Sequence, residues 1–388
     1  AAGGAAAGGG RRPWPPLMAA TLGAISLSLM HPLFSLLLER AGLSGSTIGL
    51  NAMAAPVGMV LAALLLPGLL ARLGLATLTC GALALAAATA VLVPLVDGLP
   101  AWTVLRFTYG LAVTALFYAV EFWIIAAAPE GRRGRAIGLY GICTTAAFTL
   151  GPLGVYVTGS EGVLPFAVAG ATVLLGIPAI ALGAAGAPGA ARDGRPGPFV
   201  AFGFFRSDPT LLIAILLFGV IEFGTLSLLP VWGLRTGFGE DTTVTLVALF
   251  ALGAMALQGP LGWAADRYAV RPLLAAAAFV CVLAPLMLIA AAPGLIAASS
   301  AVLVWGGFGA GLYTLALAGL GARYSGQRLA EAQAALNIAY GIGALAAPAA
   351  MGIAMDRVAA PHGLLLAASL AAAAYLALTL GRMVRVPR

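Results

Sequence analysis

Four ionisable side chains lie inside long apolar stretches of the sequence. They are His31, Arg106, Glu121 and Glu222. If these stretches cross a bilayer, each charge costs roughly 2.5–3.5 kcal/mol on insertion scales, so it persists only where it is paired, faces water or serves a function. We therefore take these four residues as the first candidates for contacting a substrate or carrying a proton.

Glu222 lies near the middle of the apolar stretch 210–232. Burial disfavours the charged form of a carboxyl group, so a change in its surroundings can drive the uptake or release of a proton. We interpret Glu222 as a site that binds and releases a proton. The alternative is a permanently protonated carboxyl group that is hydrogen-bonded to a neighbouring helix.

Arg106 and Glu121 share one helical face with Gly110, Val113 and Phe117, because these residues recur every three or four positions. The fifteen steps between the two charges span about 22 Å at 1.5 Å per residue, so the two charges cannot pair directly on a regular helix. We expect Arg106 to bind an anionic substrate group or a carboxylate. For Glu121, a gate pair with the arginines that follow it and a contact with substrate or protons both stay open.

Two further groups could contribute to the same site. His31 precedes Pro32, which bends the helix and frees a carbonyl, so the imidazole is either a proton relay or substrate contact, or a packing residue. Trp305 and Phe308 could form an aromatic wall for a flat or lipophilic substrate, or they could pack in the core.

Metal and enzyme chemistry find little support. The three cysteines, Cys80, Cys143 and Cys281, have no metal-ligand spacing, and the polar loops hold no His-rich cluster or Ser/His/Asp grouping. We therefore expect no enzyme activity, no cofactor and no metal centre. Met351 and Met355 have a spacing that could hold Cu(I), which leaves a nutrient or copper importer as an alternative, although adaptable core methionines explain the pair.

The composition then identifies the surroundings of these residues. Of the 388 residues, 62% are hydrophobic and only 9% are charged, and the mean hydropathy is +1.04. These values exclude a water-soluble fold. The net charge of +7 does not indicate a nucleic-acid partner, because the arginines lie in the loops between apolar stretches. All 20 Lys/Arg-type basic residues are arginine and the chain is rich in Ala and Gly, which suggests a GC-rich bacterial genome.

Twelve apolar windows of roughly 20 residues are long enough to cross a core of about 30 Å. The segments are apolar all round rather than alternating, so we expect helices and not a barrel. The windows are 17–38, 46–70, 75–96, 102–127, 136–158, 163–185, 210–232, 243–265, 272–293, 297–320, 332–355 and 362–381.

The arginines test this count independently, since cytoplasmic loops carry the positive excess. If the N-terminus is cytoplasmic, 16 of the 20 arginines fall on the cytoplasmic side, three fall outside and Arg106 stays within a span. We therefore expect a multi-pass protein with both termini in the cytoplasm.

The two sets of six windows resemble each other. A shift of 195 positions matches Arg40 with Arg235, Gly42 with Gly237 and Gly58 with Gly253, and a shift of 199 matches Gly110 with Gly309. Such parallel repeats suggest two related bundles. The expected parts are a cytoplasmic tail at 1–16, a bundle at 17–185, a linker at 186–209, a second bundle at 210–381 and a tail at 382–388.

A loop motif in the sequence resembles the motif of a known protein family. The segment from Gly262 to Arg271, GWAADRYAVR, resembles the G-x-x-x-D-R-x-G-R-R loop of the major facilitator superfamily, and Arg106-x-x-x-Gly110 resembles the R-x-x-x-G motif of its fourth span. The first half holds a degraded copy, GLLARLG at 68–74, in which Ala71 stands where the family has Asp.

The resemblance implies an all-α membrane fold of twelve helices in two six-helix bundles. It also implies a monomeric secondary transporter that moves a small molecule by alternating access, with spans one, four, seven and ten around the path. A non-transporting sensor is the alternative. The residues implied for a cytoplasmic gate are Gly262, Asp266, Arg267, Arg271 and Arg72.

Overall fold

A computed structural model describes residues 14–128, 133–188, 204–291 and 294–385. Within these ranges the chain forms helices and turns, and no strand occurs. Twelve of the helical segments are long and apolar enough to cross a membrane, which confirms the predicted number of spans. Large apolar side chains such as Leu64, Val157 and Ile296 are exposed on the molecular surface, as contact with lipid requires.

The first five spans are each built on one long α-helix of 18 to 29 residues, and the sixth is broken. Their elements are α1 (Trp14–Arg40), α2 (Gly45–Leu73), α3 (Leu75–Leu92) with η1 (Val93–Leu95), α4 (Leu99–Ala127), α5 (Arg133–Thr158), α6 (Leu164–Leu174), α7 (Gly176–Gly183) and η2 (Ala184–Gly186).

The second six spans are single helices. Their elements are α9 (Pro209–Arg235), α10 (Glu240–Ala265), α11 (Val270–Ala291), α12 (Leu295–Arg323), α13 (Gly326–Arg357) and α14 (Gly363–Arg385). We call the elements α1 to η2 the N-half and the elements α9 to α14 the C-half.

The helices differ from the expected windows mainly at their ends. Trp14 opens α1 although it was expected in a tail, and α14 continues to Arg385 through the expected C-terminal tail. The sixth span, expected as one helix, breaks at Leu175. Pro178 lacks the N–H that would bond the carbonyl of residue 174, so the helix loses one hydrogen bond of its ladder beside the break. The expected N-terminal tail and linker lie largely outside the described residues.

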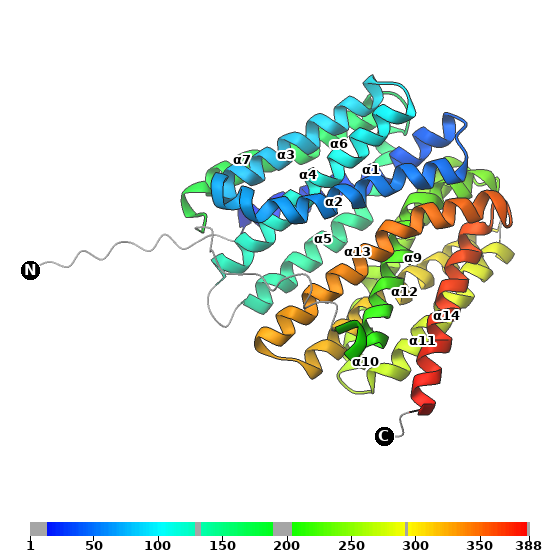
Figure 1. The fold of residues 1–388 in the computed structure, drawn as a ribbon. Coiled ribbons are helices and arrows are strands. Elements are labelled where there is room, and N and C mark those ends of the chain that lie inside the picture. The colour runs from blue at the N-terminus through cyan, green and yellow to red at the C-terminus, as the bar shows by residue number, and fades with distance from the viewer. Residues whose placement is uncertain (1–13, 129–132, 189–203, 292–293, 386–388) are drawn as a thin grey trace, which may run out of the picture.

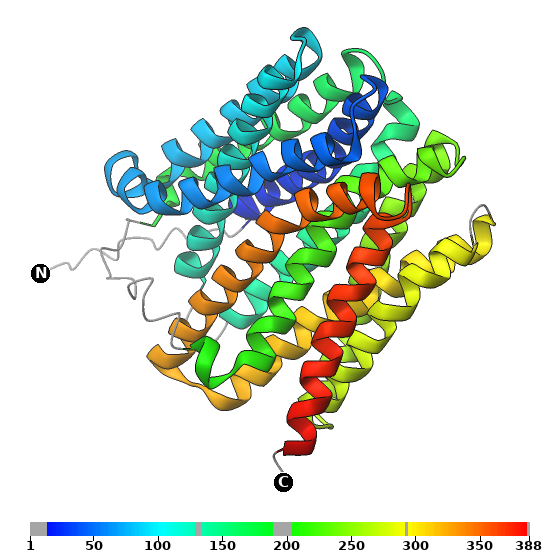
Figure 2. The same ribbon diagram turned by 45° about the vertical axis from the view of Figure 1, so that its right-hand side comes forward.

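Each half packs mainly on itself, and two helix pairs hold the halves together. Helix α2 packs on α13 and α5 packs on α10, while α1 and α2 also contact α9. Figures 1 and 2 show the two groups of helices lying close together at the loops that follow α1 and α13 and spreading apart toward the chain termini. We call these regions the opposite end and the termini end.

Equivalent glycines confirm the internal repeat. Gly42 and Gly237 both adopt positive φ, 72° and 88°, in the loops after α1 and α9. A Cβ on Gly58 would lie 2.3 Å from the Phe107 carbonyl oxygen of α4, and one on Gly253 would lie 1.9 Å from the Leu303 carbonyl oxygen of α12. The same close helix crossing therefore occurs once in each half.

The match of Gly110 with Gly309 is wrong. A Cβ on Gly110 would lie 2.4 Å from the Ala55 carbonyl oxygen, and the equivalent contact in the C-half joins Gly306 to the Phe250 carbonyl oxygen at 2.0 Å. Ala55 and Phe250 are 195 positions apart, whereas Gly309 meets only a side chain. The glycine that permits backbone contact is thus three residues earlier than expected.

Candidate functional site

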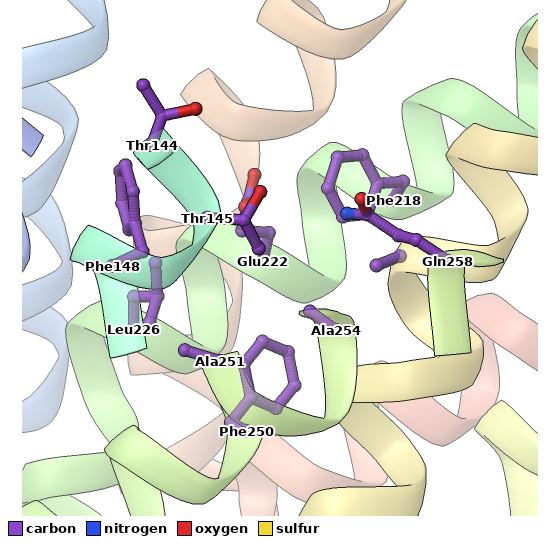
Figure 3. A pocket seen from close by; sticks show the side chains of 11 residues that line it. Thr144, Thr145, Phe148, Phe218, Glu222, Leu226, Phe250, Ala251, Ala254 and Gln258 are labelled. Carbon is purple, nitrogen blue, oxygen red and sulfur yellow. The ribbon is translucent and has the colours of Figure 1, made fainter. Parts of the chain in front are cut away.

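A cavity of about 190 Å³ lies between the halves and contains Glu222. Helix α5 of the N-half forms one wall, and helices α9, α10 and α12 of the C-half form the others (Figure 3). Phenyl rings and small side chains dominate the lining, and Glu222 is its one ionisable group. The lining residues are Thr144, Thr145, Phe148, Phe218, Glu222, Leu226, Phe250, Ala251, Ala254, Gln258 and Ala310.

Glu222 lies at the middle of α9, as the sequence indicates, and its carboxylate is held by one tyrosine. The Tyr340 hydroxyl of α13 donates a hydrogen bond of 2.6 Å to Glu222 Oε2. The Tyr340 ring packs 5.6 Å from Phe218 and 6.1 Å from Phe223, measured between ring centroids, so the donor is fixed by aromatic packing. This hydrogen bond orients the carboxylate and occupies Oε2.

Glu121 has a similar arrangement in the N-half. The Tyr140 hydroxyl of α5 donates a hydrogen bond of 2.7 Å to Glu121 Oε1. Tyr313 of α12 interacts electrostatically with both Glu121 and Glu222, so its hydroxyl lies within electrostatic range of both carboxylates. Of the arginines expected as gate partners, Arg132 and the Arg133 side chain lie outside the described residues and Arg135 is exposed.

Arg106 belongs to a different cluster, inside the N-half. Its side chain is buried, and Nη1 donates a hydrogen bond of 3.0 Å to Asn51 Oδ1. Asn51 Nδ2 in turn donates to Thr103 Oγ1 at 2.8 Å, and the guanidinium lies 5.1 Å from the centroid of the Phe34 ring. No described carboxylate forms an ion pair with Arg106.

His31 joins this cluster to the C-half. It interacts electrostatically with Arg106, and its ring packs edge-to-face on Phe223 at 5.9 Å. One turn further along α1, the Ser35 hydroxyl donates to the Ser227 carbonyl oxygen at 2.7 Å. Neither His31 nor Arg106 lines the cavity around Glu222. The structure therefore brings His31 and Arg106 together and separates both from Glu222.

Neither of the aromatic residues expected to form a wall, Trp305 and Phe308, lines the cavity. Trp305 is fully buried and packs edge-to-face on Phe250 at 5.6 Å, so it supports a cavity residue instead of lining the cavity. Phe308 and Phe117 are half-buried against the core. Their roles in substrate contact stay predictions.

Sequence reasoning missed the hydrogen-bond partners of the candidates. Three neutral polar residues of the apolar spans fill these places: Tyr340 donates to Glu222, Asn51 accepts from Arg106, and Gln258 lines the cavity. Thr144 and Thr145 were missed altogether, although two adjacent hydroxyls in an apolar span are a usable signal. Met351 and Met355 are buried in the core, with their sulfurs against Gly224 and Gly45.

Charged residues at the opposite end join the halves in a pattern that the sequence did not predict. Arg235 of α9 forms a two-pronged pair with Glu39 of α1, with both N···O distances 2.8 Å, and lies 3.3 Å from Asp356 of α13. Asp356 also accepts hydrogen bonds from the backbone N–H groups of Gly45 at 2.9 Å and Ser46 at 2.6 Å. A carboxylate is favoured at this position because it caps the first turn of α2.

Arg40 repeats this arrangement in the other half. Its Nη2 donates to Glu240 Oε2 of α10 at 2.6 Å, and Nη1 donates to the Ser160 carbonyl oxygen after α5 at 2.8 Å. Arg40 and Arg235 are the arginines that the repeat pairs, and each joins its own half to the other. We call Glu39, Arg40, Arg235, Glu240 and Asp356 the clasp.

The residues expected to form a cytoplasmic gate lie at the termini end without such partners. Asp266, Arg267 and Arg72 are exposed, and Arg271 and Gly262 are half-exposed. The Arg267 guanidinium stacks 4.1 Å above the Trp263 ring of its own half. Among the described residues, no ion pair crosses between the halves at this end. Within the described parts of the chain, the ion pairs that join the halves therefore lie at the opposite end.

Comparisons with known proteins agree with this geometry. Residues 17–348 match the sequence pattern of the Major Facilitator Superfamily. An uncharacterised MFS-type transporter of Bacillus subtilis, YfkF, is 24% identical over 262 residues, which is 66% of this chain and 66% of that relative's length.

Solved structures show the same fold at low identity. The chain is similar to a bacterial homologue of the human lysosomal transporter Spinster in an inward-facing and unoccupied conformation, with a TM-score of 0.73 and 16% identity over 96% of this chain and 97% of that one. It is also similar to the nucleoside transporter NupG, with a TM-score of 0.77 and 12% identity over 95% and 98%. Twelve spans, paired halves and the sequence match together establish that the chain belongs to the major facilitator superfamily, a family of transporters and not of enzymes.

Proposed function

We propose that the protein moves a small organic solute across a bacterial inner membrane by alternating access, and that Glu222 couples this movement to protons. The observation that carries the proposal is the position of Glu222, which lines the cavity between the two halves. A carboxyl group at bilayer depth costs free energy, so it is expected to serve a function. At the interface between the halves, Glu222 can serve transport.

The coupling rests on a change of surroundings. Glu222 contacts α13 through Tyr340 and faces α5 across the cavity, so a rocking motion of the halves alters its exposure to water. Water stabilises the charged carboxylate and an apolar wall stabilises the neutral acid. A proton bound in one conformation and released in the other is driven by the membrane potential, at about 2.3 kcal/mol per 100 mV.

The two ends supply the gates of this cycle. With both termini in the cytoplasm, the clasp closes the outer side in the conformation described, and Asp266, Arg267 and Arg271 fasten the cytoplasmic side in the outward-open state. The absence of any described ion pair between the halves at the termini end supports this assignment, because gate residues must be free when their gate is open.

Proteoliposomes test the coupling. We expect an imposed pH gradient to drive uptake of at least one member of a panel of nucleosides, amino acids, sugars, organic acids and organic amines. Glu222→Gln should still move this solute down its own gradient but lose the dependence on the pH gradient. Asp97→Asn, which removes an exposed carboxylate in the loop before α4, is the matched control. Unchanged proton dependence in Glu222→Gln would refute the coupling, and no flux of any solute would refute transport.

Asp266→Asn tests the gate at the termini end. Because Asp266 is exposed in the conformation described, we expect the variant to insert and to unfold at the native temperature. Its transport rate should fall, since the outward-open state loses a fastening. Transport at the native rate would show that Asp266 does not belong to a gate.

A further inference from the structure

The charge of the cavity indicates what it can bind. Glu222 is the one ionisable residue in the lining, and Tyr313, which packs on Phe218, interacts electrostatically with Glu121 as well. No arginine or histidine lines the cavity, and among the described residues no ion pair includes Glu222 or Glu121. The site therefore carries an unbalanced negative charge when Glu222 is ionised.

The hydrogen bond from Tyr340 does not remove this charge. It occupies Oε2 and leaves Oε1 without a protein donor in the described structure. A neutral hydroxyl donor orients a carboxylate and stabilises it, but it supplies no positive charge. The free oxygen is thus available to a charged group of the cargo.

The rest of the lining favours a cation with an aromatic or apolar body. Phe148, Phe218 and Phe250 line the cavity. Aromatic faces carry negative potential, so they attract a cation that has left water, and their area also stabilises an apolar ring. Thr144, Thr145 and Gln258 add neutral hydrogen-bonding groups at the edge (Figure 3).

The volume of the cavity is sufficient for a single ring. A dry apolar cavity of about 150 Å³ holds a benzene molecule. The cavity here measures about 190 Å³, so it accommodates one substituted ring in the conformation described.

We propose that the cavity binds a small aromatic organic cation, with Glu222 as its counter-charge and the phenyl rings as its apolar cage. This assignment rests on the proposed function, in which the same cavity carries the cargo. It identifies the chemical class of that cargo as an arylammonium or arylalkylammonium ion.

Binding to the purified full-length protein in detergent tests the proposal. The probe is radiolabelled phenyltrimethylammonium, and the competitors are unlabelled probe, its uncharged carbon isostere tert-butylbenzene and the anion benzenesulfonate. We expect the isostere and the anion to compete at least about tenfold less well than the cation. Equal competition by the isostere, or stronger competition by the anion, would overturn the proposal.

Variants locate the binding. Glu222→Gln should weaken binding of the probe about tenfold, Phe218→Leu should weaken it less, and Asp97→Asn should bind as the native protein does. Glu222→Asp keeps the charge and should retain part of the affinity, which separates loss of charge from misfolding, and thermal unfolding of each variant provides a second check. Native affinity in Glu222→Gln would overturn the assignment.

The two proposals fail in different ways. Binding of the cation without flux in proteoliposomes would leave the site standing and refute transport. Proton-driven flux of a neutral or anionic solute, with no binding of the cation, would leave transport standing and refute the assigned class.

Discussion

Glycines of helices α2 and α13 bring the two backbones together at the opposite end, and the glycines compared nearer the termini make no such contact between these two helices. A Cβ on Gly49 of α2 would lie 2.1 Å from the Pro348 carbonyl oxygen of α13, and one on Gly352 would lie 2.2 Å from the Gly45 carbonyl oxygen. Nearer the termini, a Cβ on Gly68 of α2 or on Gly341 of α13 would meet no atom within 4 Å. The halves are thus in backbone contact where the clasp lies.

The charged residues follow the same division. The clasp lies beside the close glycine contacts, whereas Asp266 and Arg72 at the termini end are exposed. Close packing and ion pairs therefore coincide at one end, so a transition to the other conformation has to break both. The two ends therefore differ in how they hold the halves together, and the difference indicates which contacts stabilise the conformation described.

Among the substitutions proposed, Arg235→Leu should change the difference between the opposite end and the termini end most. Arg235, Glu39 and Asp356 have side chains only 25%, 18% and 20% exposed, so their hydrogen bonds are partly shielded from water. Hydrogen bonds to charged groups contribute about 1.5–3 kcal/mol, and their loss should favour the opposite conformation roughly tenfold to a hundredfold.

Spin labels can follow this change. With the native cysteines replaced by serine, labels at Val163 and Val358 report the opposite end, and labels at Leu73 and Tyr268 report the termini end; all four side chains are exposed. We expect Arg235→Leu to lengthen the first distance and shorten the second. Arg357→Leu removes an exposed arginine at the same end as a control. Unaltered distances in Arg235→Leu would show that the clasp does not hold the halves.

Gly49→Ala should have the next largest effect. The added methyl group would overlap the Pro348 carbonyl, so α2 and α13 must separate, at a cost of about 1–3 kcal/mol. Gly68→Ala is the matched control on the same helix, where the methyl group meets open space and alanine favours the helix. The spin-label distances and the thermal unfolding temperature should change for Gly49→Ala alone. A similar response from both variants would show that the close packing of α2 on α13 does not stabilise this conformation.

The sequence predicts the number and type of spans well because apolar length decides them. It fails where a single residue acts on the backbone, as Pro178 does in the sixth span, and at helix ends, since α13 begins at Gly326 and not at 332. Helices continue past the bilayer into water, where hydropathy no longer marks them.

The site was predictable in its charges and not in its partners. Glu222 and Arg106 are identifiable because an ionisable residue in an apolar span is rare. That Tyr340, 118 positions later, donates to Glu222 depends on the rotation of α13 against α9, which periodicity along one helix does not fix. For the same reason the sequence could not place Arg106 and Glu222 in separate clusters.

The clasp was also predictable only in part. The repeat singled out Arg40 and Arg235, but it treated them as marks of common architecture. Their partners Glu39 and Glu240 come from the other half in each case, and contact between halves is invisible to an alignment of one half on the other. A pair of repeated arginines, each beside a helix end, is a signal for contacts between repeats.

Arg40→Leu should give the smallest of the three effects and so tests whether the clasp is symmetric in energy as well as in position. Arg40 is 30% exposed and its partners Glu240 and Glu161 are 32% and 81% exposed, so water screens these pairs more than it screens the Arg235 pairs. We expect a cost of about 0.2–1 kcal/mol, and hence a change in the Val163–Val358 distance distribution that is smaller than for Arg235→Leu. Glu240→Gln should resemble Arg40→Leu, because it breaks the same pair between the halves. An effect of Arg40→Leu equal to that of Arg235→Leu would mean that burial does not set the strength of the clasp, and that its two parts act as one unit.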